Sequence, residues 1–191
     1  MIDIILASKS PFRKEMLEKR KIPFEVIVSN ADETPDESKS YEEQLKDISK
    51  RKAMKVLEET SSRGKRIIVA ADQNIVFNGN MYGKPKTLED ARYLIKTMFG
   101  RDDIYAYTGN CVIYADGNQI LKILSGTDIS KMSMDTPSPE EFEDYLQNNR
   151  PLSKCGGILI TDTPFLHLVE GKMSTASGMT IEYLEEMLTS I

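Results

Sequence analysis

A short apolar strand runs directly into a helix in the segment IDIILASKSPFR, residues 2–13. The apolar residues 2–7 predict a buried strand. Pro11 suits the first position of a helix, which we expect to end near Lys21, and Ser10 is a favourable N-cap residue before it. A strand that turns tightly into a helix is typical of α/β proteins, and the helix start offers free N–H groups to an anion.

Outward from this segment, strands and helices continue to alternate. The apolar run 67–71 predicts a strand that ends on Asp72, and the middle of the chain predicts two long strands joined by a turn at residues 116–118. The other expected elements are strands over residues 24–28 and 165–169, helices over 41–58, 87–98, 137–148 and 180–188, a hairpin turn at 78–79, and loops over 30–39, 83–85 and 151–157. Together they predict an α/β fold with a mixed sheet.

Composition narrows the class of protein. With 191 residues, 40% of them hydrophobic, the chain suits a single domain over residues 1–191 that has a packed core. No apolar run approaches the ~20 residues of a membrane helix, and no signal peptide is apparent, so we expect a cytosolic protein. The net charge of −5 disfavours binding to long nucleic acid. Two distant cysteines and one histidine exclude His-rich metal sites and predict no disulfide framework.

The first candidate site is an anion site at the start of the 11–21 helix. Ser8 and Ser10 add hydroxyl groups to the free N–H groups of that helix. Arg13 lies in the first turn, where a cation opposes the helix dipole, and this placement is understandable if Arg13 binds an anion. The alternative is that Ser10 is an ordinary N-cap and Arg13 a solvated side chain.

The remaining candidates are two carboxylates and two lysines. Asp72, expected at a strand end, could hold a hard cation or accept a proton from water, or simply cap a turn. Lys52 falls on the apolar stripe of its helix, so it either snorkels or reaches into a polar cleft. Lys84 precedes Pro85 and Glu33 lies in an acidic loop. For both of these, an ordinary surface position is the alternative.

Taken together, these segments resemble the Maf family of nucleotide pyrophosphatases. The motifs that carry the resemblance are ILASKSPFRKE at residues 5–15, AD at 71–72, GKP at 83–85 with EDA at 89–91, and YTG at 107–109; DET at 32–34 and KA at 52–53 also fit. The correspondence extends from residue 2 to about residue 180. It is the combination of motifs at these spacings that makes the match specific.

The resemblance implies an α/β fold with an extended, curved mixed sheet and two lobes around a cleft. It also implies hydrolysis of a nucleoside triphosphate between its α and β phosphates, with Mg²⁺, Mn²⁺ or a similar divalent ion. Asp72 would then be the general base and, with Glu33, a metal ligand. Lys52, Lys84, Ser8, Ser10 and Arg13 would hold the triphosphate. Family members are often dimers, so a homodimer is also expected.

Three positions bear on the choice of base. Phe12 and Gln73 stand where members acting on dTTP and UTP carry arginine and threonine, and they resemble the branch that hydrolyses 7-methyl-GTP. A cationic methylated guanine stacks well on an aromatic ring. The family's third specificity position corresponds to Asp162 when the match to the family is anchored on residues 155–157. It corresponds to Thr161 when the match is anchored on residues 151–152.

Other function classes remain open at this point. The chain could be a nucleotide-binding regulator of cell division without significant catalysis, although the presence of Asp72, Glu33, Lys52 and Lys84 argues against a dead enzyme. It could also be a phosphatase that releases orthophosphate, which product identity would reveal. A purely structural module would leave the inward-facing Lys52 unexplained.

Overall fold

The computed structural model describes residues 2–191. In chain order the elements are β1 (Asp3–Leu6), α1 (Pro11–Lys19), β2 (Glu25–Val26), α2 (Tyr41–Glu59), β3 (Arg66–Phe77), β4 (Asn80–Tyr82), α3 (Leu88–Lys96), β5 (Ile104–Asp116), β6 (Gln119–Met134), α4 (Pro139–Asn148), the 3-10 turns Pro151–Ser153 and Cys155–Gly157, β7 (Leu166–Glu170), α5 (Met173–Ala176) and α6 (Glu182–Thr189). The alternation predicted from the sequence is confirmed, although the strand expected over residues 24–28 is only two residues long.

One mixed sheet organises the described residues. Its strands lie in the order β2-β1-β3-β5-β6-β7, and β4 pairs with β3. β1 is parallel to both β2 and β3, whereas β3 and β4, and β6 and β7, are antiparallel. The β3–β4 hairpin turns at Asn78 and Gly79, whose φ values of 54° and 72° are those of a type I′ turn. The predicted α/β fold with a mixed sheet is confirmed.

The residues group into two compact units. Among the described residues, unit 1 contains 2–72, 108–128 and 178–191, and unit 2 contains 73–107 and 129–177. Three strands contribute residues to both units, because the boundaries fall within β3, β5 and at the junction 128/129 of β6.

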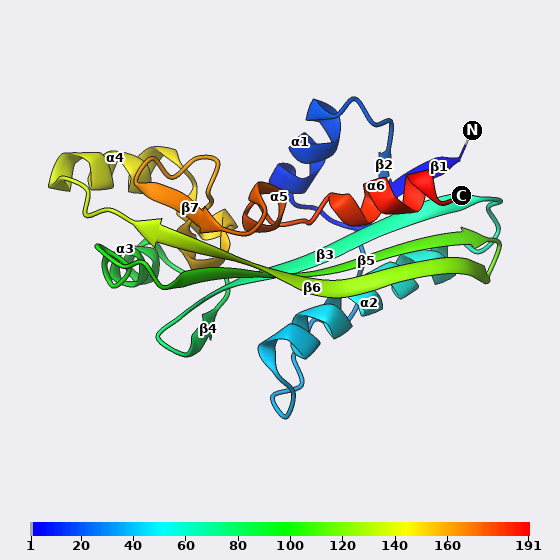
Figure 1. Cartoon of the computed structure of the whole chain (residues 1–191), viewed down its shortest axis with the longest axis horizontal. Coiled ribbons are helices and arrows are strands. Elements are labelled where there is room, and N and C mark those ends of the chain that lie inside the picture. Colours follow the sequence, from blue (N-terminus) through cyan, green and yellow to red (C-terminus); the bar gives the residue numbers. More distant parts are fainter. Residues whose placement is uncertain (1) are drawn as a thin grey trace. The chain divides into compact units, whose positions relative to one another are not determined.

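Unit 1 has an apolar core on each face of its strands, as the two-residue period of a strand dictates. On one face, Ile5 and Ile68 pack with α2 residues such as Val56. On the other, Leu6 and Val69 pack with residues of α1 and α6. Figure 1 shows α2 on one side of these strands, and α1 and α6 on the other. Because Asp72 has the parity of Ile68, its side chain belongs to the face covered by α2.

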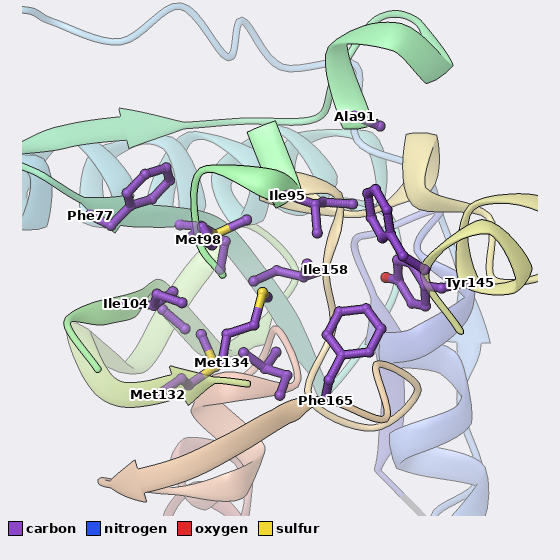
Figure 2. Packing of buried hydrophobic residues seen from close by; sticks show 14 of the residues in the cluster. Phe77, Ala91, Ile95, Met98, Ile104, Met132, Met134, Tyr145, Ile158 and Phe165 are labelled. Atoms are coloured by element: carbon purple, nitrogen blue, oxygen red, sulfur yellow. The ribbon is translucent and has the colours of Figure 1, made fainter. Parts of the chain in front are cut away.

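Unit 2 has a core of its own that is rich in Ile, Met and aromatic side chains. Figure 2 shows Ile95, Tyr145, Ile158 and Phe165 pointing toward one another within it. The rings of Tyr145 and Phe165 meet edge to face, with centroids 5.4 Å apart. Such pairs are favoured by the aromatic quadrupole and fix the packing of α4 against the segment before β7.

The prediction that a strand ends on Asp72 is wrong. β3 continues for five more residues to Phe77, with buried and half-buried side chains alternating from Ala71 to Ile75. The strand persists through the polar residues 72–74 because its neighbours satisfy the backbone: β5 lies beside it, and β4 pairs with residues 75–77. Asp72 therefore lies in the middle of a strand. The hairpin turn predicted at residues 78–79 is confirmed as the turn between β3 and β4, whereas α5 was not predicted.

Candidate active site

Lys52, Asp72 and Glu33 form the central cluster of unit 1. The ammonium nitrogen of Lys52 lies 2.6 Å from Asp72 Oδ1 and 3.0 Å from Glu33 Oε2. The side chains of Lys52 and Asp72 are 8% and 17% exposed, whereas that of Glu33 is 56% exposed. The prediction that Lys52 faces inward is confirmed, and three residues far apart in the sequence are brought together. The cluster has one cation for two carboxylates.

The position of Lys52 follows from how α2 is anchored. A capping box fixes its first turn, because Ser40 accepts a hydrogen bond from the Glu43 N–H and Glu43 accepts one from the Ser40 N–H. Further along, α2 approaches β5 at Gly109, where an added Cβ would lie 2.2 Å from the Leu45 carbonyl oxygen. No residue with a side chain fits that contact. Gly109 thus lets α2 lie close enough for Lys52 to reach the strand that carries Asp72.

Ser8 and Arg13 form a second polar group in unit 1. Ser8 Oγ accepts hydrogen bonds from Arg13 Nη1 and from the Ser10 N–H, each 3.1 Å long. Arg13 Nε donates to the Gly178 carbonyl oxygen at 2.8 Å. Ser10 occupies the N-cap position as predicted, but its side chain makes no capping hydrogen bond. The guanidinium of Arg13 is therefore oriented by two neutral oxygens, in a first helical turn that holds no acidic residue.

These two groups lie at neighbouring positions of the sheet, Ser8 just after the end of β1 and Asp72 within β3. β1 and β3 are in parallel register, with Leu6 opposite Val69, and the Ala7 N–H donates to the Val69 carbonyl at 2.8 Å. Continued by two residues, the register places Ser8 opposite Ala71, one residue before Asp72. Adjacent strands lie about 4.8 Å apart, so the backbones of the two groups are close neighbours.

Three further candidates, Gln73, Lys84 and Asp162, lie in unit 2. Gln73 is buried, and its Nε2 donates to the Thr175 carbonyl at 2.9 Å, so its amide holds the end of α5. Lys84 is exposed. Asp162 Oδ1 lies 2.6 Å from the buried Nζ of Lys154. Burial lowers the pKa of Lys154, and the pairing with Asp162 opposes that shift.

Phe12, the remaining candidate, lies in the first turn of α1 and is half-buried. One contact was invisible in the sequence, namely the Gly178 carbonyl that receives Arg13. The segment that carries it is fixed to β5, because the Asn110 side chain accepts a hydrogen bond from the Thr180 N–H and donates one to Thr180 Oγ1. Arg13 donates here to a main-chain oxygen, which every residue type has, so no pattern of residues reveals the contact.

The donor set of unit 1 suits a divalent cation of the Mg²⁺ type. Asp72 Oδ1 and Glu33 Oε2 both contact the Lys52 ammonium, so the two carboxylates are close neighbours. Mg²⁺ in phosphate-handling sites usually takes one or two carboxylates, keeps several waters and binds substrate phosphates. Across residues 2–191, no cluster of three or more His, Cys, Asp or Glu side chains could cage a metal. The residues therefore fit an ion that shares its ligands with the substrate.

Comparison with known sequences identifies the family. The sequence model of the Maf family, described as Maf-like protein, matches residues 3–191. The chain belongs to the Maf family. The motifs quoted above all fall within the matched range. No helix among residues 2–191 has the length and apolarity that crossing a membrane requires.

Curated relatives agree over nearly the full length of the chain. The dTTP/UTP pyrophosphatase of Clostridium perfringens (strain SM101) is 32% identical over 97% of this chain and 95% of its own length. That of Thermotoga maritima is 32% identical over 96% of this chain and 88% of its own length. Among solved structures, a nucleoside-triphosphatase (dITP/XTP pyrophosphatase) of Mycobacterium abscessus is 13% identical, with a TM-score of 0.40 over 98% of this chain and 94% of that one. That structure is too distant to guide the assignment of residues.

Proposed function

We propose that this Maf-family protein is a hydrolase that cleaves nucleoside triphosphates between the α and β phosphates, releasing a nucleoside monophosphate and pyrophosphate. The family and the names of the curated relatives support this activity. The observation that carries it in this chain is the Lys52 ammonium shared by Asp72 and Glu33. A cation between two neighbouring carboxylates, on a strand whose parallel neighbour β1 leads into the start of α1, suits the handling of phosphates.

Asp72 is the residue that we assign to activate water. Its side chain keeps 17% of its surface exposed, so a water molecule can reach it, and Lys52 fixes its orientation through Oδ1. In this role the carboxylate accepts a proton as the oxygen of water attacks phosphorus. The proton moves to Asp72, the new P–O bond forms, and the bond to the bridging oxygen breaks so that pyrophosphate leaves.

To Ser8 and Arg13 we assign the binding of phosphate oxygens. Because Ser8 Oγ already accepts two hydrogen bonds, its own proton is left to donate to an anion. Arg13 supplies positive charge at the N-terminus of α1, where the helix dipole already favours an anion. Ser10 and Lys84 are further phosphate-binding candidates that follow from the family resemblance.

A divalent ion belongs to this proposal as well. Asp72 and Glu33 would hold it, and when bound it would neutralise charge on the phosphate oxygens. The residues of the chain provide the complementary functions: Asp72 holds the proton, and Lys52, Ser8 and Arg13 orient the substrate.

The base of the preferred substrate is a separate point from the reaction type. The relatives named above are called dTTP/UTP pyrophosphatases, whereas Phe12 and Gln73 favoured 7-methyl-GTP. Gln73 uses its amide nitrogen to hold α5, so Phe12, half-buried at the start of α1, is the better placed of the two to stack on a base. Asp162 remains a candidate whose Oδ1 is paired with Lys154.

The test is to incubate the purified protein with ATP, GTP, CTP, UTP, dTTP and 7-methyl-GTP, each with Mg²⁺ or Mn²⁺, and to identify all products by chromatography. We expect equal amounts of monophosphate and pyrophosphate from at least one substrate, and none with EDTA. Faster turnover of 7-methyl-GTP would support the role of Phe12, and a Phe12→Arg variant should then lose that preference. Faster turnover of dTTP or UTP would overturn it.

Two other results would contradict the proposal. Release of orthophosphate would make the protein a phosphatase. Tight metal-dependent binding of nucleotides without any product would favour the nucleotide-binding regulator.

A further inference from the structure

Glu33 lies on a segment with little packing beneath it. Residues 32–40 are all exposed, and they form no helix or strand. A hollow of about 510 Å³ separates this segment from α2, lined by Thr34, Pro35 and Lys39 on one side and by Lys50, Arg51 and Met54 on the other. Polar contacts, rather than apolar burial, must therefore set the position of Glu33.

Arg51 supplies the contact nearest to Glu33. Its Nη2 donates to the Thr34 carbonyl oxygen at 2.7 Å, and its Nη1 lies 3.7 Å from Asp32 Oδ2. The two residues that flank Glu33 are thus held by one guanidinium. Asp32 in turn closes a turn across Glu33, because its Oδ1 accepts a hydrogen bond from the Thr34 N–H at 2.9 Å.

The other end of the segment has a separate attachment. Lys39 pairs with Asp47 at 2.5 Å, and the Gln44 side chain donates to the Lys39 carbonyl at 2.9 Å. The segment is therefore fixed to α2 at both ends and spans the hollow between them. Only the Arg51 end adjoins Glu33, and Arg51 immediately precedes Lys52 in the chain.

We propose that Arg51 is a positioning residue that holds the turn Asp32–Thr34 so that the Glu33 carboxylate meets Lys52. This inference rests on the proposed function, in which Glu33 serves the phosphate and metal chemistry. Arg51 contacts no reacting atom in this scheme. Its planar fork reaches a carbonyl and a carboxylate together, which a lysine cannot do with the same geometry.

The experiment compares the unmodified protein with Arg51→Ala, Arg51→Lys, Lys50→Ala and Glu33→Gln. Lys50→Ala is the matched control, since it removes a neighbouring cation that lines the same hollow. Turnover is measured against Mn²⁺ concentration, and hydrogen exchange by mass spectrometry follows residues 30–39. For Arg51→Ala we expect the Mn²⁺ concentration for half-maximal turnover to rise about 10-fold, or turnover to fall about 10-fold. This is the lower end of the loss expected when a group that orients a metal ligand is removed. Exchange should be faster in residues 30–39, with Arg51→Lys intermediate and Lys50→Ala unchanged.

A double variant separates positioning from a general effect. If Arg51 acts through Glu33, Arg51→Ala adds no further loss in the Glu33→Gln background. Full additivity, or unchanged exchange of residues 30–39 in Arg51→Ala, would overturn the inference. Absence of turnover in the unmodified protein would instead overturn the proposed function, and the exchange comparison would still decide whether Arg51 holds the segment.

Discussion

Two buried lysines, one in each unit, pair with an aspartate at the same distance of 2.6 Å, yet their surroundings differ. Lys154 in unit 2 is 1% exposed and donates to Asp162 and, at 3.3 Å, to Tyr145 Oη. That hydroxyl also accepts from Thr163 and donates to the Gly157 carbonyl. Lys52 in unit 1 instead meets two carboxylates, and Glu33, one of them, is on an exposed segment.

This difference distinguishes Lys154, which has a structural role, from Lys52, for which we propose a role in catalysis. Around Lys154 the hydrogen bonds close on protein groups, so the network fixes the turns before β7 to α4. Lys52 instead has a second carboxylate, Glu33, which is 56% exposed against 29% for Asp162, and through which a phosphate or a metal ion can join. Burial of a charged pair is therefore insufficient to identify an active site, and the openness of the partners must be considered as well.

The largest expected effect is on turnover, and it comes from changing Asp72 beside Lys52. Asp72→Asn should lower turnover by at least about 100-fold, because an amide cannot act as the general base. The variant should stay folded, since asparagine has nearly the same shape and its carbonyl oxygen can still accept from Lys52. The measurement is the rate of pyrophosphate release with the best substrate, alongside a circular dichroism spectrum. Near-normal turnover in a folded variant would remove Asp72 from the mechanism.

The next effect concerns stability. Lys154→Met should lower the free energy of unfolding by about 2 kcal/mol, because it removes a buried donor from the buried Tyr145 hydroxyl and from Asp162, which is 29% exposed. Lys52→Met should cost less stability, since Glu33 is 56% exposed on an exposed segment and can turn its carboxylate toward water. Urea unfolding of both variants checks the order, provided that the m-values agree.

The order should reverse for turnover, where Lys52→Met loses more than Lys154→Met. Equal stability losses in the two variants, or a greater loss of turnover in Lys154→Met, would show that the contrast between the two lysines is wrong.

The sequence allowed much of unit 1 to be predicted, and the reason is periodicity. The strand–helix segment at residues 2–13 and the apolar stripe around Lys52 are repeating patterns, so the inward position of Lys52 followed from its neighbours. The extension of β3 past Asp72 was missed because polar residues at 72–74 look like a strand end when pairing partners are unknown. Four residues of α5 are too few to show a helical period.

Contacts made by the main chain and by loops could not be predicted from the sequence either. The Gly178 carbonyl that receives Arg13 belongs to the backbone, and no residue pattern marks it. Lys154 lies in a segment predicted only as a loop, where a lysine is expected to be solvated. Its burial depends on Tyr145 and Asp162, which reach it through tertiary packing.

The smallest expected effect concerns the exposed turn Asp32–Thr34, which carries Glu33. Hydrogen bonding by Thr34 lowers the pKa of Asp32 from its usual 3.8, and the nearby charge of Arg51 adds a smaller shift in the same direction. A lowered folded-state pKa means that the turn gains stability above pH 3.8 and loses it as pH falls through the lower folded value. The NMR shift of the Thr34 N–H should therefore titrate with a midpoint below 3.8. Arg51→Ala should move that midpoint upward and Lys50→Ala should not. A midpoint at 3.8 or above in the unmodified protein would mean that Asp32 does not close the turn in solution, and that the Arg51 bond to the Thr34 carbonyl and the Lys52 contact hold Glu33 without it.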